Sequence, residues 1–324
     1  MNNRKLLPLG LAAAAVLLLA LALLALSAHT ETEEDTGIPL FSFGREELSA
    51  VSWSGNSVEI TLLRGKEGSW MLDSDPTLPL DQAAVESQLA ALTGLTARRT
   101  LAGEELTALP DRAAVPLITL TATAGETVRT LEVDQLNTIA DVYYVYDDSG
   151  VVYTADHGDV DALLLTAAEL YAPQSLTDHV MDDVLTMQVN DLSFTQTDGV
   201  WTLTDEPDTP LDQTAVDKMA NTFCTLKSGW SVTSPGPDEA YGLDNPDVTV
   251  TLDFSDGSSV TARFGGLCVE DETLCYLAAD SHPAVVLEVP VSARDAYAPT
   301  RESLYDHSTP ETAANDIIAE HPVG

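Results

Sequence analysis

The side chains best suited to binding a metal gather in one short segment. Asp178, His179, Asp182 and Asp183 follow one another closely, and a helical turn would bring His179 beside Asp183. Carboxylate and imidazole groups are common ligands of divalent metals. A polar linker between two domains would have the same composition, and we favour that interpretation. The sequence therefore predicts no metal site, and it gives no indication of a cofactor.

Motifs of the common enzyme classes are absent from the sequence. There is no His-Glu-x-x-His, Gly-x-Ser-x-Gly or Gly-x-Gly-x-x-Gly segment, no phosphate-binding Gly-Lys-Ser/Thr loop and no Cys-x-x-Cys pair. The 52 acidic residues are so abundant that no two can be singled out, because an acid–base pair requires carboxyl groups in distinct environments. We predict that the protein has no catalytic residues and is not an enzyme.

The three cysteines leave two alternatives open. Cys268 and Cys275 could form a disulfide across a loop in an oxidising compartment, with Cys224 buried. Alternatively, all three are free thiols. Three is an odd number, and so few cysteines in a long chain are typical of a fold that does not depend on disulfides.

One segment of the chain occurs twice, and this repeat determines the expected architecture. Trp70-Met-Leu-Asp-Ser-Asp-Pro-Thr-Leu-Pro-Leu-Asp-Gln-Ala-Ala-Val85 recurs 131 residues later as Trp201-Thr-Leu-Thr-Asp-Glu-Pro-Asp-Thr-Pro-Leu-Asp-Gln-Thr-Ala-Val216. Nine of the sixteen aligned residues are identical, so a duplication explains the likeness better than chance. A period this long is that of a whole domain, unlike the short units of solenoids.

Each copy of the repeated segment predicts a strand followed by a helix. A tryptophan alternates with a leucine, as in a half-buried strand, and an aspartate then stands where a helix would begin and is a good N-cap. Asp198-Gly199 and Asp256-Gly257 predict hairpins in the second copy. The residues that define this repeat signature are Trp70, Leu72, Asp81, Trp201, Leu203 and Asp212.

These elements predict an α+β fold. We expect an N-terminal transmembrane helix followed by two tandem duplicated modules, each a mainly antiparallel sheet covered by a helix. A short helical stretch is expected to close each module, with the matching phrases Leu170-Tyr-Ala-Pro173 and Ala296-Tyr-Ala-Pro299. The predicted parts are a cytoplasmic stub and transmembrane anchor (1–28), an acidic linker (29–46), the two repeats (47–178 and 179–308) and a flexible tail (309–324).

The N-terminal segment predicts the location of the chain. Residues 6–26 are apolar apart from Pro8 and Gly10, which is long enough to span a bilayer. Arg4 and Lys5 precede this stretch, so the positive-inside rule places the N-terminus in the cytoplasm and the bulk of the chain outside, as a single-pass protein of the cell membrane. The alternative is a signal peptide cleaved near Ser27.

The charge of the outer part is strongly negative. Beyond residue 28 there are 12 basic and 52 acidic residues, and 12 − 52 gives −40. Such a charge repels nucleic acid and anionic lipids and attracts cations or basic partners. The alternative, which we favour, is that the acidic residues serve solubility.

Several phrases of the second copy together resemble a known family. The tryptophan strand and the Asp-capped helix are followed by Tyr241-Gly-Leu-Asp-Asn-Pro246, a strand, and an Asp-Gly hairpin. In this order they resemble the bacterial domain-of-unknown-function family 4340. The resemblance implies an exported, membrane-anchored protein, and some members are associated with ABC transporters of the gliding-motility auxiliary type. It implies no activity.

The first copy departs from this family pattern. It has Leu109-Pro-Asp-Arg in place of the tyrosine phrase, and only Pro116 matches Pro246, one residue out of register. A binding site built on the phrase would therefore exist only in the second copy. We favour a structural role instead, in which Gly242 and Pro246 shape a loop that leads into a strand while Tyr241 and Leu243 pack beneath it.

Three hypotheses for function follow. The first is a membrane-anchored extracytoplasmic binding or scaffold protein, an accessory of ABC transporter subunits or of other envelope proteins. The alternative is a cell-envelope hydrolase with a site between the two modules. The third is capture of a ligand such as calcium by the acidic surface.

Overall fold

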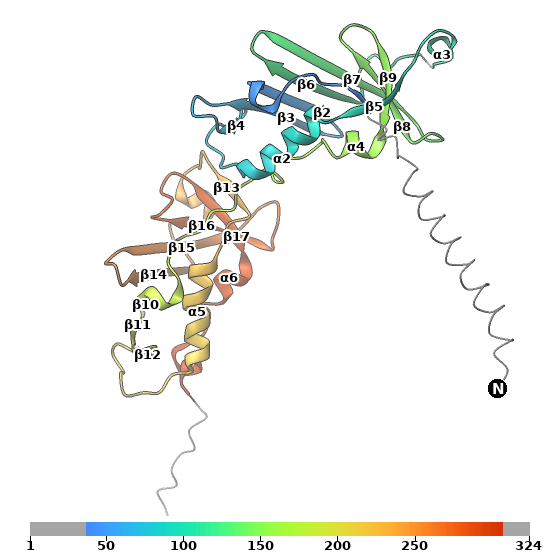
Figure 1. Cartoon of the computed structure of the whole chain (residues 1–324). Coiled ribbons are helices and arrows are strands. Elements are labelled where there is room, and N and C mark those ends of the chain that lie inside the picture. Colours follow the sequence, from blue (N-terminus) through green and yellow to red (C-terminus); the bar gives the residue numbers. More distant parts are fainter. Residues whose placement is uncertain (1–36, 110, 307–324) are drawn as a thin grey trace, which may run out of the picture. The chain divides into compact units, whose positions relative to one another are not determined.

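The computed structural model describes residues 37–109 and 111–306, which form two antiparallel sheets with few helices (Figure 1). Contacts within the chain divide it into two compact units, residues up to 59 with 87–164, and residues 60–86 with 165 onward. Among the described residues, no helix has the length and apolar character needed to cross a bilayer. The predicted transmembrane segment over residues 6–26 lies outside the described part.

The first sheet has nine strands in the order β1-β5-β9-β8-β7-β6-β2-β3-β4. Its strands and the helices between them are β1 (Ile38–Pro39), η1 (Arg45–Glu47), β2 (Ala50–Gly55), β3 (Val58–Arg64), β4 (Trp70–Leu72), α2 (Gln82–Thr93), β5 (Thr96–Thr100), α3 (Glu104–Thr107), β6 (Ile118–Ala124), β7 (Thr127–Asn137), β8 (Val142–Asp147), β9 (Val152–Asp156) and α4 (His157–Asp161).

The second sheet has eight strands in the order β12-β11-β10-β14-β15-β16-β17-β13. Its elements are η2 (Met181–Asp183), β10 (Val184–Val189), β11 (Leu192–Thr197), β12 (Val200–Leu203), α5 (Gln213–Thr225), β13 (Trp230–Val232), η3 (Asp238–Tyr241), β14 (Val248–Phe254), β15 (Ser259–Leu267), β16 (Leu274–Ala279), β17 (Val286–Pro290), α6 (Val291–Asp295) and η4 (Arg301–Leu304).

The two sheets have the same topology. When β2 is matched to β10, and each following strand to its counterpart, the strand orders are identical except for β1 at the edge of the first sheet. The second sheet has a shorter equivalent of β1, because Ser175 forms an antiparallel bridge with Lys227 and Leu176 is buried. This agreement of strand orders is the structural counterpart of the sequence repeat.

The segment predicted as an acidic linker, 29–46, contains part of the first sheet. Pro39 pairs with Thr96, and Leu40 and Phe41 are only 1% and 3% exposed. These apolar residues stand directly after the polar segment, so the change in composition marks where the fold begins. The predicted boundaries at 178 and 308 stay predictions.

A glutamine joins the helix to the tryptophan strand in both copies. In the second, the Gln213 amide accepts a hydrogen bond from the Trp201 N–H (2.7 Å) and donates to the Trp201 carbonyl (3.0 Å). Gln82 makes the same two bonds with Trp70, at 2.8 and 3.0 Å. Since β4 and β12 are edge strands, each glutamine takes the place of a further strand.

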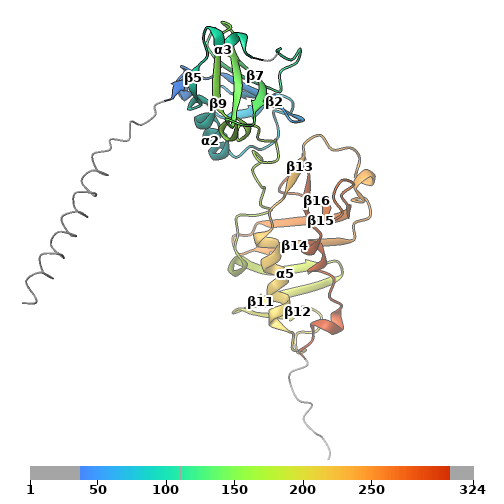
Figure 2. The same ribbon diagram turned by 90° about the vertical axis from the view of Figure 1, so that its right-hand side faces the viewer.

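The predicted N-caps are confirmed. The Asp81 carboxylate accepts from the N–H groups of Ala83 and Ala84, at 2.9 and 3.2 Å, and Asp212 accepts from Ala215 at 3.2 Å. The helices that follow cover their sheets with apolar side chains, and Figure 2 shows α5 lying across one face of the second sheet. The buried residues of α5 are Val216, Met219, Ala220 and Phe223.

The predicted hairpins of the second sheet are also present. Asp198 and Gly199 have φ angles of 51° and 79°, as a type I′ turn between β11 and β12 requires. Gly257 has φ 86° in the turn between β14 and β15, which are paired antiparallel. The turn glycines and aspartates therefore fix the strand register as the sequence suggested.

The predicted correspondence between the closing phrases Leu170-Tyr-Ala-Pro173 and Ala296-Tyr-Ala-Pro299 is wrong. The N–H of Asp81 donates to the Leu170 carbonyl and that of Asp212 to the Leu304 carbonyl, both at 2.8 Å. Leu170-Tyr171 is therefore equivalent to Leu304-Tyr305, and not to Ala296-Tyr297. The likeness of the two Tyr-Ala-Pro phrases is accidental, because the shared backbone bonds decide which residues correspond.

A carboxylate holds the turn between β8 and β9 in the first sheet. Asp147 is 8% exposed, accepts hydrogen bonds from Ser149, Val151 and Tyr153, and forms an ion pair with Arg129 at 3.0 Å. Burial alone would raise the pKa of Asp147, but these hydrogen bonds and the positive charge of Arg129 outweigh burial and lower it.

Candidate functional site

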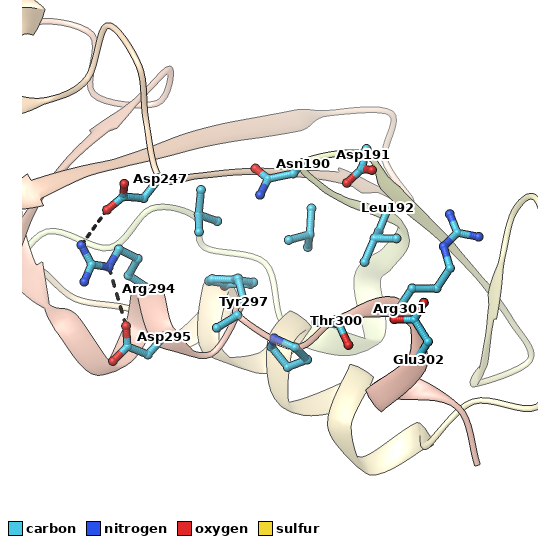
Figure 3. A pocket seen from close by; sticks show the side chains of 14 residues that line it. Asn190, Asp191, Leu192, Asp247, Arg294, Asp295, Tyr297, Thr300, Arg301 and Glu302 are labelled. Atoms are coloured by element: carbon cyan, nitrogen blue, oxygen red, sulfur yellow. Dashed lines mark hydrogen bonds and ion pairs between the residues drawn. The ribbon is translucent and has the colours of Figure 1, made fainter. Parts of the chain in front are cut away.

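A hollow of about 570 Å³ at one end of the second sheet is the best candidate for a binding site (Figure 3). Three segments far apart in the sequence build it: the β10–β11 turn, the residues that lead into β14, and the stretch from α6 to η4. Its lining residues are Val189, Asn190, Asp191, Leu192, Asp247, Val248, Arg294, Asp295, Tyr297, Ala298, Pro299, Thr300, Arg301 and Glu302.

Arg294 is held at one end of the hollow between two aspartates. Its Nη1 lies 2.9 Å from Asp247 Oδ2 and its Nε lies 3.7 Å from Asp295 Oδ1, as the dashed lines of Figure 3 show. The arginine side chain is 18% exposed, whereas both aspartates are more than half exposed. The guanidinium is thus fixed in position, while the carboxylates keep oxygens open to solvent.

Arg301 is held in the same way at the other end. Its Nη1 lies 2.8 Å from both Asp205 Oδ2 and Glu206 Oε1. The hydrogen bond to Asp205 has the largest effect on the pKa of Arg301, followed by the hydrogen bond to Glu206. Both raise this pKa above its already high value, so the side chain stays charged. Tyr305 strengthens the arrangement, because its hydroxyl donates to Glu206 at 2.9 Å.

Backbone geometry and one buried ring shape the walls between the arginines. Asn190 has φ 51°, and its side-chain oxygen accepts from the Thr249 N–H at 2.8 Å, which closes the β10–β11 turn onto β14. Tyr297 is 4% exposed, and its hydroxyl donates to the Met219 carbonyl of α5. Burial raises the pKa of Tyr297, so the ring serves as a neutral wall.

The arrangement suits recognition of a polar ligand. Fixed guanidinium groups bind carboxylate or phosphate oxygens, and the exposed carboxylates around them bind amino or guanidinium groups. The groups of the hollow therefore match a ligand or partner that carries charged or hydrogen-bonding groups.

Comparison with known proteins identifies the family of one region, which is most of the second copy. Residues 201–319 match the model of a family described as a domain of unknown function (DUF4340). This region of the chain belongs to the DUF4340 family. No curated protein and no solved structure matches the chain. The DUF4340 match begins at the tryptophan strand β12 and includes most of the hollow, from Asp247 to Glu302.

The tyrosine phrase of the DUF4340 region has a structural role. Gly242 has φ 68°, and a Cβ at Gly265 would lie 2.3 Å from the Tyr241 carbonyl, so two glycines allow the phrase to lie directly on β15. Leu243 is fully buried, and the Tyr241 ring packs edge-on against Tyr276 at 4.9 Å. None of these side chains lines the hollow.

The remaining signature residues lie in the cores or loops of the fold. Trp70, Leu72, Trp201 and Leu203 are between 0% and 5% exposed. Pro246 stands two residues before β14, as Pro116 stands two residues before β6, so the mismatch of one residue seen in the sequence disappears in the structure. The signature marks the fold and does not mark the site.

The predicted cluster at 178–183 forms contacts but no metal centre. His179 lies 3.5 Å from Asp183 and 3.5 Å from Asp256, and its ring stacks on Phe254 at 4.2 Å. Residues 37–109 and 111–306 contain no group of three or more ligating side chains arranged to hold a metal. His179 instead links η2 to the β14–β15 turn.

The three cysteines are free thiols, which decides between the two alternatives. Burial raises the pKa of Cys224 to about 11, of Cys268 to about 12 and of Cys275 to about 11. Thiols with these pKa values are almost entirely protonated near neutral pH and are poor nucleophiles. None of them lines the hollow.

Sequence reasoning missed the hollow altogether. The only signal along the chain was the pair Arg294 and Arg301, seven residues apart in a region poor in basic residues. Apart from Asp295, their carboxylate partners come from separate segments, at 205–206 and 247, so local spacing could not reveal the site.

Proposed function

We propose that this protein is a non-enzymatic binding or scaffold protein, tethered to the cell membrane by residues 6–26 and acting outside the cytoplasm as an accessory of an ABC transporter. Its two tandem modules present the same fold twice. The observation that carries the proposal is the hollow with Arg294 and Arg301 fixed by carboxylates. Charges held in place in the free protein need little reorganisation on binding.

The acidic surface supports a protein partner with basic residues. A net charge of −40 beyond residue 28 accelerates encounter with a positively charged surface and disfavours nucleic acid. The transporter association comes from the family resemblance alone, and the hydrolase remains the alternative. A hydrolase site would hold a carboxyl group of raised pKa. Burial, together with the charges of Glu270 and Asp271, raises the pKa of Glu288, but this half-buried residue does not line the hollow.

Site-specific crosslinking in intact cells tests the proposal. A photoreactive amino acid at Thr300, on the rim of the hollow, should crosslink to a transporter subunit or another envelope protein when the full chain is expressed. The same amino acid at Thr107, an exposed position in α3, is the matched control. Recovery of no envelope protein at Thr300, or the same products at both positions, would refute the binding role of the hollow.

A further inference from the structure

A second hollow of the DUF4340 region carries positive charge only. It has a volume of about 420 Å³ and lies between α5 and α6. Its lining residues, which we call the lysine groove, are Lys218, Thr222, Thr225, Leu226, Lys227, Pro290, Ser292, Ala293 and Ala296. No acidic residue is among them, although the chain has 52 acidic and only 14 basic residues.

The two lysines of the groove are unlike the arginines of the same sheet. Arg263, Arg294 and Arg301 each form an ion pair with at least one carboxylate. Among the described residues, no acidic side chain forms an ion pair with Lys218 or Lys227, and both lysines are exposed. In so acidic a molecule, two exposed cations beside one hollow, without a carboxylate partner among the described residues, form a local group that an anionic ligand would complement.

The fold does not require these lysines. In the first copy, the positions 131 residues earlier are Ser87 in α2 and Thr96 in β5. Thr96 pairs with Pro39 just as Lys227 bridges to Ser175, so the backbone environments correspond. The first copy therefore forms the same sheet and helix with uncharged side chains at both positions.

The shape of the groove suits an extended chain. Lys218, Thr222 and Thr225 follow at helical spacing along one face of α5, and small residues of α6 form the opposite wall. At about 1.5 Å per residue, Lys218 lies roughly 10 Å from Thr225 at the end of α5, and Lys227 follows two residues later. An extended peptide covers this length in about three or four residues.

We propose that the lysine groove binds an acidic, extended segment of a partner protein, with two carboxylates three or four residues apart that pair with Lys218 and Lys227. This assignment rests on charge complementarity and on the space that the small side chains of Ala293 and Ala296 leave in the groove. A second copy of this chain is a poorer occupant, because two molecules of net charge −38 repel each other. The inference is independent of the proposed function of the arginine-lined hollow.

Fluorescence anisotropy of the full chain in detergent tests the proposal. The probe is a serine-rich peptide with two glutamates four residues apart and an uncharged dye, and its control has glutamine at both positions. Replacing both lysines, Lys218→Gln with Lys227→Gln, should weaken binding of the glutamate peptide about tenfold, which corresponds to about 1.4 kcal/mol. The arginine pair, Lys218→Arg with Lys227→Arg, should retain binding within about twofold, since it preserves the charge.

Lys66→Gln is the matched control, because it makes the same change of charge at a described lysine outside the groove. It should leave binding of the glutamate peptide unchanged. The proposal is overturned if the wild-type chain does not bind this peptide, if it binds the glutamine peptide equally well, or if Lys66→Gln weakens binding as much as the groove variants. Binding to phosphatidylglycerol vesicles without binding to the peptide would also overturn it, and would assign the groove to lipid.

Discussion

The substitution Gln213→Ala tests whether one side chain fastens the helix to the edge of the second sheet. The Gln213 amide makes three hydrogen bonds to backbone groups, two with Trp201 at 2.7 and 3.0 Å and one with the Leu211 carbonyl at 3.3 Å. Each such bond contributes about 1 kcal/mol net, and partial access of water offsets some of the loss. We expect the free energy of unfolding to fall by about 2 kcal/mol.

Urea denaturation of the full chain, followed by tryptophan fluorescence, measures this loss. Gln188→Ala is the matched control, because the Gln188 side chain is exposed and makes a single hydrogen bond, to the Asn190 carbonyl at 3.1 Å. It should change the free energy by less than about 0.5 kcal/mol. Gln82→Ala should reproduce the larger loss in the first sheet, since its bonds with Trp70 are the same. Equal effects of Gln213→Ala and Gln188→Ala would refute the reasoning.

Three further predictions concern strain, thiols and pH. Gly265→Ala should lower the free energy of unfolding by about 1–3 kcal/mol in urea denaturation, because the new Cβ would meet the Tyr241 carbonyl at 2.3 Å, whereas Gly257→Ala meets no atom within 4 Å and should cost only about 1 kcal/mol for its positive φ. The three free thiols, of which Cys268 and Cys275 are buried and Cys224 is partly buried, should react with Ellman's reagent at pH 8 on the order of a hundredfold more slowly in the folded chain than in urea; equal rates would contradict their raised pKa values. Asp147, whose pKa is lowered on folding, stabilises the fold above the unfolded pKa of about 3.9 and loses this contribution as pH falls below it, so the difference in Tm between wild type and Asp147→Asn should shrink from pH 6 to pH 3.

The sequence was informative where local patterns decide the structure. The Asp212 cap, the Asp198-Gly199 turn and the tryptophan strand depend on residues a few positions apart, and all three are present. The topology of the two sheets could be anticipated only as a likeness between copies, because the order of the strands depends on pairings between distant segments. Short phrases misled: Ala296-Tyr-Ala-Pro299 resembles Leu170-Tyr-Ala-Pro173 by accident.

The candidate site could not be found in the same way. The two arginines of the hollow are recognisable only after the carboxylates of Asp205, Glu206 and Asp247 have been brought to them by the fold. In a chain with 52 acidic residues, such partners have no distinguishing sequence context. Prediction of the site therefore needed the tertiary structure, as prediction of the strand order did, whereas the caps, turns and the tryptophan strand followed from local sequence.

The differences between the two copies indicate where function resides. Lys227 has Thr96 as its counterpart, and the half-buried Glu288, which pairs across the strands with Trp230, has Thr154 at the equivalent register position. Both copies keep the glutamine clamp, the helix cap and the strand order, so these changes are not needed for folding. Charged groups that leave a shared scaffold intact are best explained by contacts with something outside it. On this argument the second copy is the better candidate for the proposed binding surface, and exchanging Lys227 for threonine should alter binding without altering the fold.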